Sequence, residues 1–84
     1  MKHRRVVFSD HFLDQAALLP PRTRDRAFGY VMEIAAEEDP ALLALPDPDG
    51  IPHVWRVERF DLTVSVAVYD DVLRVDALTV RANG

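Results

Sequence analysis

Cysteine is absent from this 84-residue chain, and glycine and lysine are scarce. Without cysteine the chain has no disulfide framework and no thiolate metal site, which is typical of proteins from a reducing compartment. No apolar run approaches the roughly 20 residues that a bilayer-spanning helix needs. The apolar run near the N-terminus is far too short for a secretory signal. We therefore expect a cytoplasmic protein with no membrane partner.

A broad positive surface is also missing, since the formal net charge is −4. Residues 1–26 carry six cations against three acids, which gives +3. Residues 27–53 carry six acids and no lysine or arginine, which gives −6, and the remainder contributes −1. Nucleic-acid-binding proteins usually offer phosphates a wide basic face. The charge distribution therefore argues against RNA or DNA as the default partner.

The first half of the chain predicts one strand and two helices. The β-branched run at 4–8 fits a strand, and Ser9 is a suitable N-cap for a helix that ends at Pro20-Pro21. A second helix is expected from Pro21 or Arg22 to about Glu38. Its predicted apolar stripe has helical spacing and consists of Phe28, Val31, Met32 and Ala35. The proline-rich segment 41–52 is expected to be a loop, with one helical turn at 41–45.

The second half predicts a meander of three antiparallel strands, at 54–59, 62–69 and 72–80. Residues 62–69 alternate strictly, with Leu62, Val64, Val66 and Val68 on one side. The other side of this strand is only weakly polar and includes Tyr69, so a partner segment or a second copy of the chain can be expected there. The single tryptophan, Trp55, is expected to pack in the core.

The order of elements therefore predicts one α+β domain spanning residues 1–84. Its arrangement is β-α-α-β-β-β, with two antiparallel helices packed on one face of a small, mainly antiparallel four-stranded sheet. The position at which the first strand joins the sheet is not determined by the pattern.

The same order, the opening VVFSDHFLDQAALLPPRTRDRA and the closing WRVERFDLTVSVAVYDDVLRVDALTVR resemble the RelE/ParE superfamily of toxins from bacterial type II toxin–antitoxin systems. RelE-like members cleave messenger RNA in the ribosome without a metal, and ParE-like members poison DNA gyrase. The resemblance implies a RelE-like fold, a cognate antitoxin as partner and no cofactor. If the chain is active, it implies a metal-independent endoribonuclease (an mRNA interferase) that inhibits translation with ribosome and mRNA as its targets.

Carried over by position, the resemblance assigns Arg56 and Arg81 as the catalytic, phosphate-stabilising residues. Other family positions differ: Val54 and Thr63 stand where basic residues are usual, and the tyrosine expected beyond Arg81 is missing. A second hypothesis therefore stays open. In it the chain is a catalytically lapsed binding module that acts through an antitoxin, gyrase or self-association as a homodimer.

Two further residues are candidates for substrate binding. Arg59 can join Arg56 from the hairpin that follows the second strand, although an arginine at a turn is usually just solvated. His53 precedes the same strand and can act as a general base if it lies within hydrogen-bond reach of a substrate hydroxyl. Pairing of the strand arginines with Glu58 and Asp76 is the simpler alternative to a phosphate site. The histidine spacing matches no metal motif.

Overall fold

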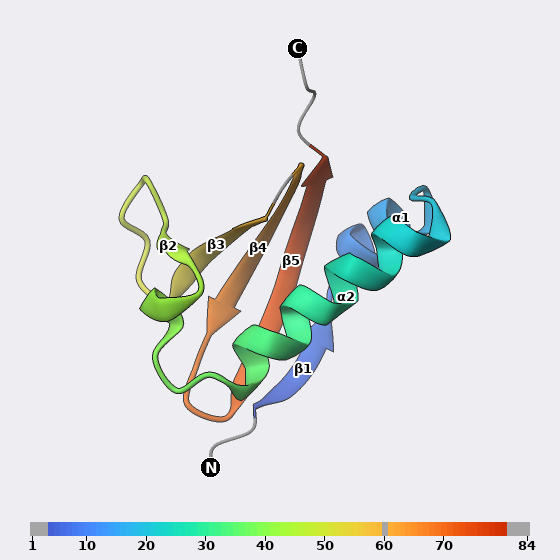
Figure 1. Cartoon of the computed structure of the whole chain (residues 1–84). Helices are drawn as coiled ribbons and strands as arrows, with labels where there is room; N and C mark the ends of the chain where they lie inside the picture. Colours follow the sequence, from blue (N-terminus) through green and yellow to red (C-terminus); the bar gives the residue numbers. More distant parts are fainter. Residues whose placement is uncertain (1–3, 60, 81–84) are drawn as a thin grey trace.

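The computed structural model describes residues 4–59 and 61–80 of the chain. Two helices lie across a five-stranded sheet whose strands follow the order β1-β5-β4-β3-β2 (Figure 1). The elements are β1 (Arg5–Phe8), α1 (Asp10–Ala17), α2 (Pro21–Ala36), the short 3₁₀ helix η1 (Pro40–Leu42), β2 (Leu45–Pro46), β3 (Val54–Arg59), β4 (Leu62–Val68) and β5 (Val72–Val80).

The predicted α+β class is confirmed, and the sheet is mainly antiparallel as expected, but the predicted number of four strands is wrong. The sheet has five strands and is mixed, because β1 pairs in parallel with β5 at one edge. The fifth strand, β2, consists of only two residues and pairs antiparallel with β3 at the other edge. It lies in the proline-rich segment where a loop was expected. A two-residue strand formed by tertiary pairing leaves no periodic pattern to detect.

Helix α1 starts at the residue that the sequence predicts. The Ser9 hydroxyl accepts a hydrogen bond from the backbone N–H of Phe12 at 3.0 Å, which is the geometry of an N-cap. Phe12 and Ala16 are buried. The Phe12 ring stacks on Phe8 and meets Phe28 edge-on, with centroid separations of 5.3 and 5.6 Å. These rings fix α1 and α2 over the edge of the sheet formed by β1 and β5.

Helix α2 begins at Pro21, as predicted, and ends at Ala36, two residues before the predicted boundary. Its buried residues are Ala27, Val31, Ile34 and Ala35. Met32 was placed on the apolar stripe but is 46% exposed, and Ile34 contacts the core instead. The buried residues are spaced i, i+4, i+7 and i+8, so the buried stripe of α2 is rotated slightly from the predicted one. Neither helix in the described part of the chain is long and apolar enough to cross a membrane.

The sheet core follows the predicted alternation on β4, where Leu62, Val64, Val66 and Val68 are all buried. On β5 the register shifts, because Ser65 pairs with Ala77 while Val66 pairs with Val75. Asp76 is therefore the extra residue of a β-bulge. The bulge changes the phase of β5, so that Leu73, Val75 and Leu78 all face the helices. Ser9 also holds the bulge, since its hydroxyl donates to the Asp76 carbonyl at 2.7 Å.

The open face of the sheet as candidate functional site

The helices cover one face of the sheet and leave the other open (Figure 1). Because neighbouring strand residues point to opposite faces, the residues that alternate with the buried ones form this open face. Arg56 pairs with Ser65, which pairs with Ala77 on β5. In the next row Ala67 pairs with Arg74, which pairs with Val7 on β1. Two arginines on strands flanking β4 thus lie in adjacent rows of the open face.

Arg56 occupies the middle of β3 and lines a hollow of about 290 Å³ between this strand and residues 41–45. Its Nε lies 3.8 Å from a carboxylate oxygen of Glu58, which is close enough for an ion pair and too far for a hydrogen bond. The predicted pairing with Glu58 is present. Among the described residues, Arg56 Nε has no hydrogen-bond partner although the atom is buried. The Arg56 guanidinium is therefore held near Glu58, and its Nε donates no hydrogen bond to a described residue.

Arg59 lies on the other side of the sheet, away from Arg56. Its Nη2 is 3.4 Å from a Glu33 carboxylate oxygen, and its guanidinium carbon lies 5.6 Å from the centroid of the Tyr30 ring. Both contacts belong to α2. The structure does not bring Arg59 to Arg56, because residues three apart on a strand point to opposite faces. A substrate-binding role for Arg59 stays a prediction. Its observed contacts connect β3 to helix α2.

His53 lies just before β3 with a backbone φ of 69°, in the left-handed region that a non-glycine residue rarely adopts. Its Nδ1 is 3.2 Å from the Val68 carbonyl oxygen, and its ring stacks on Tyr69 with centroids 5.0 Å apart. A carbonyl only accepts, so Nδ1 carries the proton and Nε2 of the neutral ring keeps its lone pair. This geometry is compatible with the predicted base role, which nothing in the structure tests.

Arg74 and Tyr69 are site residues that the sequence interpretation missed. Arg74 donates from Nε and Nη2 to the two Asp76 carboxylate oxygens at 2.8 and 3.4 Å. The hydrogen bonding of Arg74 to the Asp76 carboxylate, and then the negative charge of that carboxylate, raise the pKa of Arg74 above its ordinary value. Arg74 is thus a permanent cation on the open face. The sequence did contain a signal for this placement: Arg74 lies between the buried-face residues Leu73 and Val75 in the alternation of β5, which predicts that its side chain points to the open face.

Arg81, the second predicted catalytic residue, lies outside the described residues, so its placement beside Arg56 is untested. Asp76, which the sequence analysis named as an alternative partner of a strand arginine, is bound by Arg74. Within residues 4–59 and 61–80 no group of three or more histidine or acidic residues is arranged to hold a metal ion.

Comparison with known proteins gives matches at the level of structure. No protein-family model matches the sequence, and no curated protein matches it. The toxin–antitoxin complex RelBE2 from Mycobacterium tuberculosis contains a similar chain, with a TM-score of 0.84 and 15% identity over 99% of this chain and 97% of that one. The isolated RelE toxin from E. coli matches with a TM-score of 0.77 and 13% identity, over 96% of this chain and 87% of its own.

An archaeal RelE–RelB complex from Pyrococcus horikoshii provides a further match that covers both chains fully, with a TM-score of 0.73 and 20% identity. Identities this low establish the shape of the backbone and leave the chemistry of the site undecided. The resemblance read from the sequence is confirmed at this level: the chain has the fold of the RelE toxins.

Proposed function

We propose that this protein is the toxin component of a toxin–antitoxin pair and is held by a cognate antitoxin chain. The observation that carries the proposal is the RelE fold, which extends over 99% of this chain and 97% of its counterpart in the RelBE2 complex. Solved RelE-type structures from bacteria and archaea contain both toxin and antitoxin. The length of the match leaves no large segment of this chain for an unrelated activity.

The activity that we propose is inhibition of translation through metal-independent cleavage of ribosome-bound messenger RNA. Cleavage by a 2′-hydroxyl places negative charge on the phosphorus oxygens, and fixed cations aimed at those oxygens lower the barrier. Arg56 supports this role, because its guanidinium is held on the open face without a hydrogen-bonded acceptor among the described residues. Arg74 is a second cation in the next row. Arg81 remains the other proposed catalytic residue.

Acid–base assistance has two candidates at one end of the open face. The neutral tautomer of His53 that donates from Nδ1 to the Val68 carbonyl has its lone pair on Nε2, and the ring stacks on Tyr69, which is 40% exposed. These side chains stand at the opposite end of the sheet from the C-terminal strand end where the family's tyrosine is expected. In the form of the proposal that places the phosphate beside Arg56 and Arg74, they exchange protons with the attacking hydroxyl or the leaving oxygen of a bound RNA.

Controlled expression of the chain in bacteria tests the proposal. Growth, incorporation of labelled amino acid and the 5′ ends of messenger RNA are measured after induction. We expect translation arrest and new RNA ends, both abolished by the Arg56→Ala/Arg81→Ala double variant. Arg59→Ala is the matched control, since this arginine contacts α2, and it should arrest growth like the unmodified chain.

A second function is favoured by a specific observation on the same face. Arg56 faces Glu58 and Arg74 binds Asp76, so both described arginine–acid pairs are close to neutral. Such a face suits protein contacts better than phosphate. In this alternative the chain is a lapsed binding module that acts through an antitoxin, gyrase or a second copy of itself. Absence of arrest favours the module, whereas arrest that survives the double variant favours gyrase, which a supercoiling assay measures directly.

A further inference from the structure

Strand β1 forms one edge of the sheet, and no strand of the described chain lies beyond it (Figure 1). The backbone N–H groups of Arg5 and Ser9 donate to carbonyl oxygens on the β5 side, both at 2.9 Å. Because the hydrogen-bonding direction alternates along a strand, the N–H and C=O groups of Val6 and Phe8 point away from β5. Among the described residues, no hydrogen bond joins these groups to another element. The outer edge of β1 is therefore free to pair.

The two edges of the sheet differ in how they are protected. β2 at the other edge contains only Leu45 and Pro46, and a proline has no N–H to offer to a further strand. β1 has neither proline nor a bulge, and its only charged residue, Arg5, stands at its end. Prolines, bulges and inward charges are the usual protections of an exposed edge. β1 is thus the edge at which another strand can extend this sheet.

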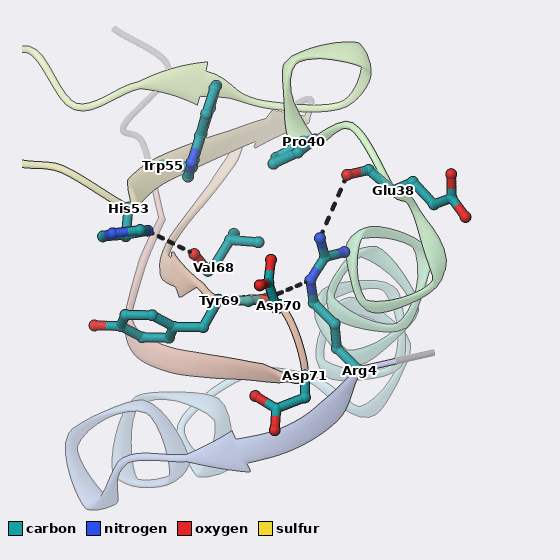
Figure 2. A pocket seen from close by; sticks show the side chains of 9 residues that line it. All are labelled: Arg4, Glu38, Pro40, His53, Trp55, Val68, Tyr69, Asp70 and Asp71. Atoms are coloured by element: carbon teal, nitrogen blue, oxygen red, sulfur yellow. Dashed lines mark hydrogen bonds between the residues drawn. The ribbon is translucent and has the colours of Figure 1, made fainter. Parts of the chain in front are cut away.

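The edge is also held in place before any partner arrives. Arg4, directly before β1, is buried and donates to the carbonyl oxygens of Tyr69 (2.6 Å) and Glu38 (3.4 Å), as Figure 2 shows. At the other end of the strand, the Ser9 hydroxyl donates to the Asp76 carbonyl at 2.7 Å. Both ends of β1 are therefore fixed, which lowers the entropy cost of pairing.

The sequence of β1 matches itself when a second copy lies antiparallel to it. In the register centred on Val7, Val6 lies opposite Phe8 of the second copy, and Val7 lies opposite its own counterpart. Val6 and Phe8 carry the outward-pointing backbone groups, so each Val6–Phe8 pair can exchange both of its N–H···O=C bonds. The two-fold axis passes through the Val7 pair, where side chains come closest. Val7 is 43% exposed, so this contact buries apolar surface.

The charges at the ends of this register are complementary. Arg5 lies opposite Ser9 of the second copy, which Asp10 follows directly. Both Arg5 and Asp10 are exposed, and neither forms an ion pair with another described residue. The two copies of Arg5 lie about 13 Å apart along the strands, too far to repel strongly. Backbone pairing, apolar contact and charge all suit a second copy of this chain.

We propose that two copies of the chain join their sheets through antiparallel β1 strands. The two-fold axis of such a pair is perpendicular to the sheet, so both helical layers lie on one side and both open faces on the other. Arg56 and Arg74 stay uncovered in both copies. The inference uses no residue that the proposed function places in catalysis and does not depend on that function.

Sedimentation equilibrium of the purified chain measures the association. Strands of four residues bury less than the roughly 1,200 Å² of a standard interface, so we expect a dissociation constant of about 10 µM to 1 mM. Val7→Lys places two ammonium groups opposite each other and should weaken association at least tenfold. Thr79→Lys is the matched control, because it adds the same charge at an exposed position of β5 on the same face, and it should associate like the unmodified chain.

The absence of cysteine provides a second measurement, which reports the register. Val7→Cys brings two residues to a Cα–Cα distance of about 4.5 Å, within the range of a disulfide, and should form a covalent dimer under mild oxidation. Arg5→Cys lies on the same strand, but its two copies stand about 13 Å apart and should stay monomeric on a non-reducing denaturing gel. Thermal unfolding shows whether each variant is folded.

Three results would overturn the proposal: a chain that is monomeric over the whole concentration range, association that Val7→Lys leaves unchanged, or cross-linking of Arg5→Cys as fast as that of Val7→Cys. If the chain is monomeric and an added antitoxin protects the Val6 and Phe8 amides from hydrogen exchange, the edge belongs to a foreign strand instead. Growth arrest tests the proposed function separately.

Discussion

On the covered face of the sheet, the arginines contact other elements of the fold, whereas on the open face each described arginine of β3 and β5 contacts an acid of its own strand. Arg4 donates to three carbonyl oxygens, and Arg59 contacts Glu33 and Tyr30 of α2. Arg56 is only within ion-pair distance of Glu58. The same residue type therefore builds the scaffold on one face and remains available for a ligand on the other. The element that supplies the contact separates the two roles, because the side chains of Arg56 and Arg59 are both 35% exposed and both face a carboxylate.

The largest expected difference between the faces concerns apolar packing. Leu73 on β5 is 0% exposed beneath the helices, and Leu73→Ala should lower the free energy of unfolding by about 2–5 kcal/mol through lost contacts and a cavity. Val7 on β1 faces the open side and is 43% exposed. Val7→Ala should cost less than about 1 kcal/mol. Urea unfolding followed by circular dichroism measures both, and equal losses would show that the open face is also part of the core.

A smaller difference is expected between the neighbouring residues Arg4 and Arg5. Arg4→Met removes the donors for the carbonyls of Tyr69 and Glu37, and should destabilise the fold by about 2–3 kcal/mol. Arg5 is exposed, and Arg5→Met should change the stability by less than about 0.5 kcal/mol. The same unfolding measurement applies. A loss in Arg5→Met that matches Arg4→Met would contradict the division between the faces.

The two faces were largely predictable from the sequence, because alternation depends on local stereochemistry. Leu62, Val64 and Val66 were assigned correctly, and the Ser9 cap fixed the start of α1. Arg56 and Arg59 are three positions apart on one strand, so the same alternation predicts that their side chains point to opposite faces of the sheet. The sequence analysis nevertheless placed both residues at one site.

Other features depend on contacts distant in sequence and could not be predicted. The parallel pairing of β1 with β5 joins residues 5–8 to residues 72–75, and no local pattern specifies that partner. The bulge at Asp76 is held by Ser9, which is 67 positions away. The hollow of about 600 Å³ beside the β4–β5 turn is lined by four separate segments, so its rings and aspartates appear unrelated in the sequence.

The smallest expected difference in stability is that between the two arginines of β3, and here function should separate them. Arg56→Ala should alter the free energy of unfolding by less than about 0.5 kcal/mol, because its ion pair is partly exposed and not hydrogen-bonded. Arg59→Ala should cost about 0.5–1 kcal/mol through the lost contacts with Tyr30 and Glu33.

Cleavage of messenger RNA should show the reverse order. Loss of one positioned cation from a phosphate site typically lowers a rate about 10²-fold or more, so Arg56→Ala should nearly abolish the RNA ends that appear after induction. Arg59→Ala should leave them unchanged, since its guanidinium is committed to α2. Primer extension on a single reporter messenger RNA, with protein levels matched by immunoblot, measures both variants. If Arg59→Ala loses cleavage and Arg56→Ala keeps it, the catalytic surface is the helix-covered side, and the assignment of the open face is wrong.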